Sequence, residues 1–387
     1  MSSQLDIFRS EARAWLEANY PSGMRDIPEG PEGTCWGGRK WKFASDDQRI
    51  WLERMAGKGW TVPRWPREYG GGGLSGAEAA ILAKEMARIK ARSPLDSLGI
   101  WMLGPALLKY GTEEQKREHL PKIARGEIRW AQGYSEPGAG SDLASVRTFA
   151  EDAGDHFIVN GSKIWTTNGD KCDWIFAIVR TDRSAPKHLG ISFLLIDMDQ
   201  PGVKPRPIKL ISGDAHFAET FFDNAIASKA NLVGELNRGW DVAKYLLTFE
   251  RNSIGSSEGR ASKESLASAA LRILGENGLA KEAALREEIV ANELEGWANT
   301  IAVERTRDLA AAGMASPISG SMLKILVTEH GKRRTELMMA MCGAEALRVG
   351  SQDSYEWLQA PSITIGGGTT EIQLNIIAKR GLGLPEA

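Results

Sequence analysis

The chain has 387 residues, of which 42% are hydrophobic and 25% are charged, and its formal net charge is −2. A chain of this length fits two or three packed domains, and its composition is ordinary for a globular protein. The near-neutral charge excludes a general electrostatic attraction to nucleic acid. We find no apolar run long enough to span a bilayer, so we expect no membrane insertion.

The N-terminal residues lack the basic start and apolar middle of a secretory signal. The three cysteines, Cys35, Cys172 and Cys342, lie far apart and do not have the spacing of a metal site. We therefore expect free thiols, no bound metal and a cytoplasmic location, because disulfides are rare in a reducing compartment.

The N-terminal third is predicted to be helical. Apolar residues at helical spacing predict amphipathic helices over residues 3–20 and 46–58. Helical patterning returns over residues 75–125, with breaks expected near Pro94 and at Pro121.

From about residue 128 to 235 the pattern changes to short β-branched or aromatic runs bounded by turn residues. The predicted strands are residues 157–159, 174–179, 191–196 and 220–222. From Gly239 to the C-terminus the pattern is helical again. Its breaks are expected near residues 275–278, 313–317, 350 and 366–368. The sequence itself therefore predicts a helical, a β-rich and a second helical part, in that order.

Two motifs in the β-rich part point to a ligand. Residues 133–142 form a loop dense in small residues, whose glycines let backbone N–H groups approach a ligand closely. Residues 163–169 place an indole and two hydroxyls at a predicted strand end. Between them, Asn160-Gly161 is a strong hairpin signal. Together they predict a module that holds a large flat polar ligand. The alternative is an ordinary glycine-rich turn beside a core tryptophan.

An acidic residue interrupts an apolar helix face in the C-terminal part. On a helix over residues 240–256, one stripe is formed by Ala243, Leu246, Leu247, Glu250 and Ile254. An ionised carboxylate on such a face needs a partner or a shifted pKa. Arg251 points roughly 100° away on the helix, so it is no automatic partner. Glu250 is therefore a candidate functional acid. The alternatives are a structural ion pair and a face that is not the buried one.

These motifs resemble those of the acyl-CoA dehydrogenases, and the resemblance covers nearly the whole chain. It also includes residues 65–71, 110–116, 234–240 and 366–373. The fold that the resemblance implies is α+β, with an N-terminal α-helical domain, a central β-barrel-like domain and a C-terminal four-helix bundle. The implied domains are residues 1–127, 128–235 and 236–387.

The resemblance implies an FAD cofactor and assigns residues to it. The residues that match FAD contacts are Tyr134, Ser135, Gly140, Trp165, Thr167, Thr369 and Glu371. Tyr134 and Ser135 would contact the pyrimidine edge of the flavin. Trp165 would lie over the ring, and Thr167 would reach N5. Ser141 matches a position that touches CoA, and Arg251 and Gly367 are the other substrate-binding candidates.

Enzymes of this family remove the α-hydrogen of an acyl-CoA thioester with a glutamate, and hydride passes from the β-carbon to flavin N5. In many members this glutamate stands at the position of Gly367, which cannot accept a proton. Other members carry the base on the first helix of the C-terminal bundle, directly before an arginine, as in Glu250-Arg251. The resemblance and the apolar stripe therefore both select Glu250 as the catalytic base. We expect structural roles for the rival acids Glu136 and Glu371, the latter at the start of the last helix.

The chain departs from the family where a neighbouring subunit completes the FAD site. The family's Arg-x-x-Phe-Gly segment corresponds to residues 270–278, where no phenylalanine is in register, and Met339 stands where Gln is expected. We therefore hypothesise a second, related subunit, as in heterotetrameric acyl-CoA dehydrogenases that act on steroid side chains. The alternative is a homo-oligomer, a dimer or a tetramer, with altered adenine contacts.

The leading prediction is a dehydrogenase of lipid or steroid catabolism that passes electrons to an electron-transfer flavoprotein. First-helix bases accompany bulky substrates in the family, so we expect a bulky, branched or steroid-derived acyl-CoA. The alternatives are a flavoenzyme of the same fold that uses oxygen and a non-catalytic subunit that completes the site of a partner. The loop at residues 35–41 is a candidate for the acyl end of the pocket or a packed structural loop.

Overall fold

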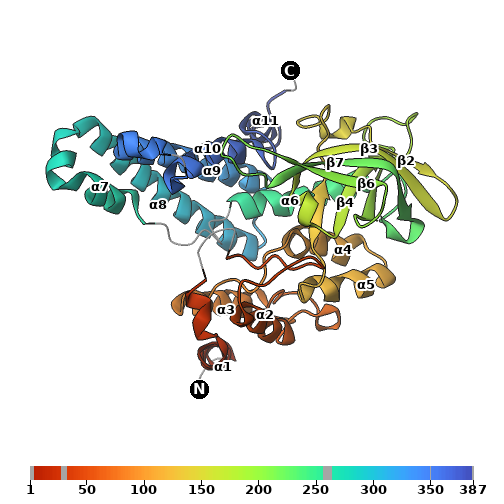
Figure 1. Cartoon of the computed structure of the whole chain (residues 1–387), viewed down its shortest axis with the longest axis horizontal. Helices are drawn as coiled ribbons and strands as arrows, with labels where there is room; N and C mark the ends of the chain where they lie inside the picture. The colour runs from red at the N-terminus through yellow and green to blue at the C-terminus, as the bar shows by residue number, and fades with distance from the viewer. Residues whose placement is uncertain (1–3, 28–32, 256–263, 349, 386–387) are drawn as a thin grey trace. The chain divides into compact units, whose positions relative to one another are not determined.

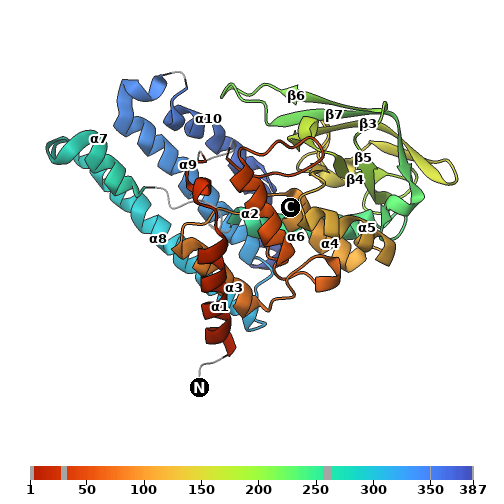
Figure 2. The ribbon, with the colours of Figure 1, turned by 60° about the horizontal axis from the view of Figure 1, so that its bottom comes forward.

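The computed structural model describes residues 4–27, 33–255, 264–348 and 350–385. The chain divides into two compact units. Unit 1 comprises Met1–Ile208 and Ala215–Leu246, and unit 2 comprises Lys209–Asp214 and Leu247–Ala387. Figures 1 and 2 show helices, then strands, then helices along the chain, which confirms the predicted α+β class. The domain boundaries at residues 127 and 235 remain predictions.

The N-terminal part of unit 1 is helical, as predicted. Its helices are α1 (Gln4–Asn19), α2 (Asp46–Gly57), α3 (Gly76–Arg88), α4 (Gly104–Tyr110) and α5 (Glu113–Ala124), with a π-helical turn at Gly99–Leu103. The hydroxyls of Ser45, Ser75 and Thr112 each accept a hydrogen bond from the backbone N–H three residues later. These side-chain caps explain where three of the helices begin.

Pro121 does not break a helix, contrary to the prediction. It lies inside α5, which continues to Ala124. A proline removes only its own backbone donor, and its ring crowds the preceding turn. The N–H of Arg125 still bonds to the carbonyl of Pro121 at 3.1 Å, so the last turn closes beyond the proline. The break near Pro94 is confirmed, since α3 ends at Arg88 and the π-helical turn follows only afterwards.

The β-rich part forms one eight-stranded sheet. Its strands are β1 (Trp130–Gly133), β2 (Phe149–Asp152), β3 (His156–Thr167), β4 (Trp174–Arg180), β5 (Ile191–Asp197), β6 (Val203–Ile208), β7 (Phe217–Ser228) and β8 (Leu232–Val233). Their order is β6-β7-β3-β2-β4-β5-β8, and β1 pairs with β4 in parallel. The four strands predicted from the sequence lie in β3, β4, β5 and β7 and are confirmed.

The sheet is open, which corrects the expected barrel-like closure. Figure 1 shows β6, β7 and β3 running side by side, with β6 at one edge. β6 carries Pro205 and Pro207, which have no N–H to donate to a further strand. The other edge, β8, is two residues long. Neither edge therefore offers the ladder of hydrogen bonds that would close a barrel.

The predicted hairpin at Asn160-Gly161 is wrong, because β3 runs straight through it. The chain reverses earlier, at residues 153–155 between β2 and β3. At Asn160-Gly161 the pairing of β3 with β7 shifts register, which is a β-bulge. Gly161 has φ +141°, and a Cβ there would lie 2.7 Å from the hydroxyl oxygen of Thr148. The side-chain oxygen of Asn160 accepts a hydrogen bond from the backbone N–H of Asn224 in β7 (2.8 Å). The glycine therefore serves a bulge, not a turn.

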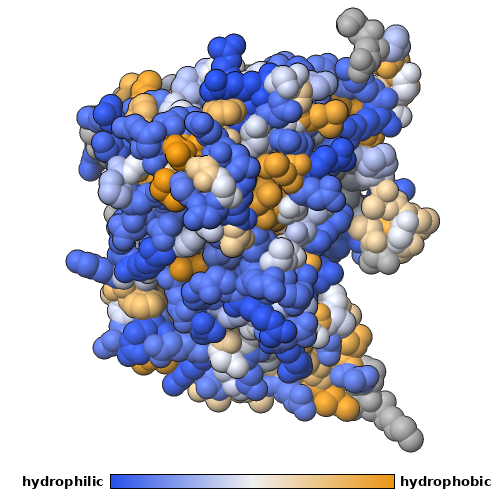
Figure 3. Space-filling view, turned by 90° about the vertical axis from the view of Figure 1, so that its right-hand side faces the viewer, coloured by the Kyte–Doolittle hydropathy of each residue, from blue (hydrophilic) through white to orange (hydrophobic). Residues whose placement is uncertain are grey.

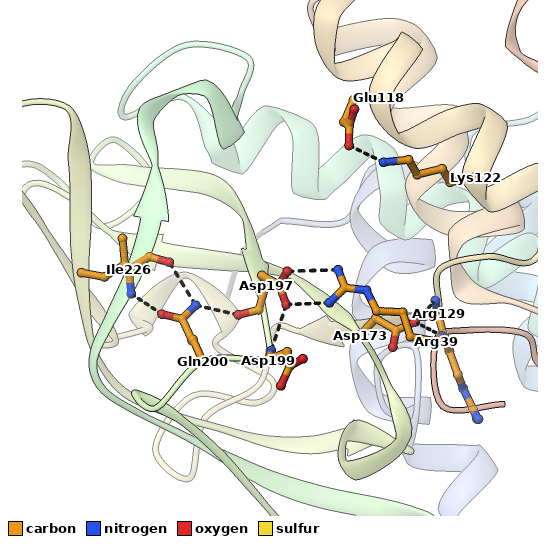
Figure 4. Close-up of polar contacts among 9 residues, drawn as sticks. All are labelled: Arg39, Glu118, Lys122, Arg129, Asp173, Asp197, Asp199, Gln200 and Ile226. Carbon is orange, nitrogen blue, oxygen red and sulfur yellow. Dashed lines mark hydrogen bonds and ion pairs between the residues drawn. The ribbon is translucent and has the colours of Figure 1, made fainter.

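Polar side chains join the N-terminal part of unit 1 to the sheet (Figure 4). The carboxylate of Asp173, 1% exposed, accepts hydrogen bonds from the backbone N–H groups of Arg39 (2.9 Å) and Arg129 (2.8 Å). The guanidinium of Arg39 also pairs with Asp197 at the end of β5, at 3.0 Å. These contacts favour a packed structural loop at residues 35–41 over a role in the acyl pocket.

The three cysteines are free thiols, as predicted, and Cys35 and Cys172 are buried. Burial raises the pKa of Cys35 to about 11 and that of Cys172 to about 12. Protonated thiols are poor nucleophiles and poor metal ligands. Within the described residues, no group of three or more His, Cys, Asp or Glu side chains is arranged to hold a metal ion.

Unit 2 combines helices with the loop Lys209–Asp214. Its helices are α6 (Gly239–Gly255, of which the part up to Leu246 belongs to unit 1), α7 (Leu266–Lys281), α8 (Ala283–Ala311), α9 (Ser319–Cys342), α10 (Gln352–Ile365) and α11 (Thr370–Arg380). The predicted breaks are confirmed, because α7 is kinked at Gly275 (φ +67°) and the others fall between helices. In Figures 1 and 2, α8 and α9 lie side by side, and with α7 they share a core that includes Leu266, Ile289 and Leu337.

The surface is mostly hydrophilic on the face that Figure 3 shows, with separate hydrophobic patches. An ordered apolar stripe lies on α8. It consists of Val290, Leu294, Trp297 and Ile301, which are 52–68% exposed. At three- and four-residue spacing these side chains lie on one side of the helix. Within the described part of the chain, none of the helices combines the length and hydropathy of a membrane span.

His119 is a buried titratable group in unit 1. Its ring is 3% exposed and packs edge-to-face against Trp130 and Trp174, each at 5.3 Å between centroids. Burial lowers its pKa from 6.5 to about 4, with Glu118 opposing the shift and Lys122 adding to it. The folded protein thus favours neutral imidazole, whereas the unfolded chain takes up a proton below pH 6.5. The stability that results is present above pH 6.5 and is lost as the pH falls toward 4.

We expect a His119→Phe variant to lose less stability in acid than the wild type does. A phenyl ring fills the same space between two indoles and does not titrate. The difference in free energy of unfolding between pH 7 and pH 4 should be smaller in the variant by about 3 kcal/mol, from the size of the pKa shift. Denaturant titrations at both pH values measure it. Equal acid sensitivity of the two proteins would contradict a neutral buried His119.

Candidate functional site

In unit 1 the structure brings the two sequence motifs together. The backbone N–H of Ile164 in β3 donates to the carbonyl of Ser135 at 2.8 Å. The ammonium of Lys163 donates to the carbonyl of Tyr134 at 3.1 Å. The loop at residues 134–142 therefore lies along the C-terminal end of β3, the strand that carries Trp165 and Thr167. The two motifs that the sequence analysis paired therefore form one surface.

Trp165 has an unusual backbone and an accessible ring. Its φ is +60°, which is rare for a bulky residue and requires support from the surroundings. It lies within a register irregularity of β3 against β7, between Lys163 and Thr166. Such irregularities re-aim side chains. The indole is 52% exposed, and its edge meets the ring of Phe217 at 5.9 Å. A flat aromatic face is thus presented at the strand end, directly before Thr167, the last residue of β3.

The predicted loop residues differ in what they present. The ring of Tyr134 is only 4% exposed and packs edge-to-face against Phe176 and Phe193. Its side chain therefore belongs to the core, and only its backbone remains as a ligand contact. Ser135 is half-buried, while Gly140 and Ser141 are exposed. A Cβ on Gly140 would meet no atom within 4 Å, so the loop leaves open space there. A half-exposed indole, a nearby hydroxyl and this open loop fit a planar ligand such as a flavin ring.

Glu136 has the structural role that we expected. Its carboxylate is 8% exposed and pairs with the ammonium of Lys163 at 2.7 Å. It also accepts hydrogen bonds from the backbone N–H groups of Arg147 (2.7 Å) and Thr148 (2.9 Å). Three hydrogen bonds inside the protein thus hold this carboxylate, which makes it a poor acceptor for a substrate proton.

Glu250 lies on α6, as predicted, in the part of the helix that belongs to unit 2. On the same helix Ala243 and Leu246 are fully buried, which confirms the start of the apolar stripe. Leu247 and Glu250 are half-buried. The side chains of Arg251 and Ile254 lie outside what the structure describes. The carboxylate of Glu250 is therefore partly shielded from water, at the boundary of the buried stripe.

The glycine segment at residues 366–368 forms the turn between α10 and α11. Gly367 and Gly368 have φ of +68° and +97°, a region that favours glycine. The carbonyls of both accept hydrogen bonds from the side-chain amide of Gln373, at 2.9 and 3.3 Å. A Cβ on Gly368 would lie 2.5 Å from that amide nitrogen. The turn is therefore held in one conformation by a side chain that is 1% exposed.

Thr369 and Glu371 both stabilise the start of α11. The hydroxyl of Thr369 accepts a hydrogen bond from the N–H of Ile372 at 3.3 Å, as the N-cap. The pKa of Glu371 is lowered, first by its own backbone N–H and then by the Thr369 hydroxyl. The expected position of Glu371 at the start of the last helix is confirmed. A ligand contact from either residue would add to this role.

Sequence reasoning missed two buried lysines that hold the site segments. Lys163 is one, and Lys324 on α9 is the other, with no exposed surface. The ammonium of Lys324 donates to the carbonyl of Thr364 at the end of α10, at 2.6 Å. Burial lowers its pKa, and Glu329 and Glu371 oppose that shift. A lysine is almost never fully buried unless it is paired, so the residue type itself predicts an exposed side chain. The only sequence signal for burial was at Lys163, where the alternation along the strand points the side chain inward.

Two segments were expected to serve a neighbouring subunit, one around Arg272 and one around Met339. Arg272 on α7 forms an exposed ion pair with Glu264 at 2.8 Å. Met339 on α9 is half-buried. In the family pattern these positions belong to an FAD-contacting arginine motif and a glutamine. Arg272 keeps the arginine of that pattern, whereas no phenylalanine follows it in register and Met339 stands where glutamine is expected.

Three family models match the chain in order. They are the acyl-CoA dehydrogenase N-terminal domain over residues 6–127, the middle domain over residues 131–225 and the C-terminal domain over residues 237–382. The acyl-CoA dehydrogenase IpdE1 of Mycolicibacterium smegmatis is 36% identical over 393 aligned residues, which cover 98% of this chain and 97% of that protein.

Solved structures show the same fold over the whole chain. The structure described as the Tcur3481-Tcur3483 steroid ACAD aligns with a TM-score of 0.74 and 31% identity, covering 100% of this chain and 99% of that one. The ChsE4-ChsE5 complex from Mycobacterium tuberculosis aligns with a TM-score of 0.71 and 28% identity, covering 100% and 99%.

Full-length similarity to named dehydrogenases makes this protein an oxidoreductase that uses a flavin. The chain belongs to the acyl-CoA dehydrogenase family, and its reaction class is the dehydrogenation of acyl-CoA thioesters.

Proposed function

We propose that this protein is an FAD-dependent dehydrogenase that introduces an α,β double bond into a bulky, branched or steroid-derived acyl-CoA. One observation carries this proposal: the loop at residues 134–142 is hydrogen-bonded to the end of β3, and the two segments form one surface. Family membership gives the reaction class, and this surface supplies a place for its flavin. The steroid preference rests on the similarity to the Tcur3481-Tcur3483 steroid ACAD.

The residues that would hold FAD in unit 1 are those with accessible groups. The backbone of Tyr134, the hydroxyl of Ser135 and the bare backbone of Gly140 would meet the edge of the ring, and the indole of Trp165 would cover one face. Thr167 would donate a hydrogen bond near N5. From unit 2, Thr369 and Glu371 are the proposed contacts. The flavin, when bound, supplies a hydride acceptor that no amino-acid side chain provides.

Glu250 is the proposed base. Its carboxylate is half-buried and follows a buried apolar stripe, so partial exclusion of water favours its use as a proton acceptor. In this proposal it takes the α-proton of the thioester and holds it on a carboxyl oxygen. Gly367, which replaces the glutamate of many relatives, leaves room for a bulky acyl group. Ser141 and Arg251 are the other proposed substrate contacts.

The assembly that we propose contains a second, related subunit. The ChsE4-ChsE5 and Tcur3481-Tcur3483 structures carry two subunit names each. In this chain the arginine motif lacks its phenylalanine and Met339 replaces glutamine, so its half of a neighbour's FAD site is altered. The exposed α8 stripe supplies apolar surface for a protein partner. An electron-transfer flavoprotein as acceptor and a cytoplasmic location complete the proposal.

One alternative is favoured by a specific observation. Gly367 stands at the base position of many relatives, which suits a non-catalytic subunit that only completes a partner's site. The exposed Trp165 ring and the open loop argue for a flavin surface of its own. An oxygen-using flavoenzyme of this fold is the other alternative, and oxygen consumption by the reduced protein distinguishes it.

A Glu250→Gln variant tests the base. Removing the proton acceptor should slow flavin bleaching on anaerobic mixing with a CoA thioester on the order of 10²- to 10⁴-fold. Stopped-flow absorbance of protein saturated with FAD measures this rate, with the substrate chosen from a panel of acyl-CoA thioesters.

The matched control is Asp241→Asn, an acid in the first turn of the same helix that pairs with Arg238 and Lys244. This variant should bleach at the wild-type rate. Near-normal bleaching in Glu250→Gln would exclude Glu250 as the base, whatever the control does.

Purification of the chain alone tests the second subunit. We expect less than one FAD per chain after gel filtration, because the adenine contacts from a partner are missing. Adding free FAD should restore binding in the micromolar range or weaker. Full, tight FAD occupancy of the chain alone would contradict a required partner and favour the homo-oligomer.

A further inference from the structure

A charged side chain lies in the interior directly beneath the loop at residues 134–142. Lys163 has no exposed surface, and its ammonium donates to two acceptors of that loop. These are the carbonyl of Tyr134 at 3.1 Å and the carboxylate of Glu136 at 2.7 Å. Lys163 precedes Trp165 by two residues on β3, so the same strand carries the buried cation and the exposed indole.

Glu136 extends this connection to a third segment. The carboxylate that pairs with Lys163 also receives the backbone N–H groups of Arg147 and Thr148. Beyond it, the tip of the loop is exposed at Pro137, Gly138 and Gly140. The pair therefore anchors the base of a loop that is exposed at these three residues.

The electrostatics explain why the two groups must stay together. Burial lowers the pKa of Lys163 to about 8, against the attraction of Glu136 and with a smaller contribution from Arg180. For Glu136, burial would raise the pKa, but Lys163 and the two backbone N–H groups lower it overall. A buried ion pair is weak evidence for stability in itself, since its desolvation offsets its attraction. Separating the groups would leave a charge unpaired in the interior. The pair therefore fixes the position of the loop at residues 134–142 relative to β3.

We propose that Lys163 and Glu136 are positioning residues for the flavin, which hold the Tyr134–Ser135 backbone in register with Trp165 and Thr167. This inference rests on the proposed FAD function. Neither side chain touches the ligand in this account. They hold the loop and the end of β3 at a fixed distance from each other before the ligand binds. Binding then does not have to pay the entropy of ordering the loop.

The test is the affinity for FAD of the full chain, measured by titration of the apo protein well below its unfolding midpoint. Lys163→Met fills the same buried volume without the charge, and Glu136→Gln removes the opposite charge. Each should raise the Kd for FAD by about tenfold or more. The double variant should not multiply the two effects, because both remove the same interaction.

Glu85→Gln is the matched control. Glu85 on α3 is also buried, at 4% exposed, and pairs with Arg13 and Arg88, but it makes no contact with the loop or with β3 in the described structure. This variant should lose stability and keep its Kd for FAD within about twofold. Lys163→Arg keeps the charge with a different shape and should give an intermediate Kd, which preserves the test if Lys163→Met does not fold.

A pH series adds a readout that a merely structural role would not produce. The charged groups that face Lys163 are Glu136 from the loop and Arg180 from β4, while its register partner on β7 is the uncharged Thr220. As the pH rises through about 8, loss of the Lys163 proton should weaken FAD binding in the wild type and not in Lys163→Met. An equal increase of the Kd for FAD with pH in the wild type and in Lys163→Met would overturn the positioning role.

Two further outcomes separate this inference from the function on which it rests. If folded Lys163→Met and Glu136→Gln bind FAD as the wild type does, or if Glu85→Gln weakens binding equally, the positioning role is wrong. If the wild type shows neither saturable FAD binding nor bleaching of added flavin by any CoA thioester, the proposed function fails first.

Discussion

The buried ammonium of Lys163 joins the two segments of the proposed ligand surface in unit 1. It needs acceptors inside the protein, and the loop that precedes β2 supplies both of them. Because the loop and β3 share this contact, neither can shift without leaving a polar group unpaired. The positive φ of Trp165 is then tolerated two residues later, where the register irregularity turns the indole outward. Strain and burial at one strand end thus produce an accessible aromatic face.

In unit 2, too, buried side chains donate hydrogen bonds to the backbone carbonyls of a second segment. Lys324, also fully buried, binds the end of α10, and Gln373 binds the carbonyls of the glycine turn that follows. The turn carries no acidic side chain at Gly367, so the base that we propose comes from another element. Glu250 on α6 is an acid at the boundary of a buried stripe. We propose that this acid is the base, held on a helix, whose side chains are more rigidly placed than those of a loop.

The sequence predicted what depends on local periodicity and missed what depends on distant contacts. Amphipathic spacing located α1 and α2, and β-branched runs located four strands. The hairpin predicted at Asn160-Gly161 was wrong because hairpins and β-bulges favour the same residue types. Only the pairing of Asn160 with Asn224 on β7 distinguishes the bulge from the hairpin. The burial of the Tyr134 ring depends on aromatic neighbours on β4 and β5. The burial of Lys163 was missed because its acceptors lie about thirty positions earlier in the chain.

The proposed chemistry is one reaction, in which a thioester loses its α-proton to Glu250 and its β-hydride to the flavin. The most direct measurement is single-turnover flavin bleaching by FAD-loaded protein with a CoA thioester carrying deuterium at C2 or at C3. The account predicts that deuterium at either carbon slows bleaching and that the product is the α,β-unsaturated thioester. Failure of every thioester to bleach the flavin, or bleaching that is insensitive to deuterium at both carbons, would contradict it.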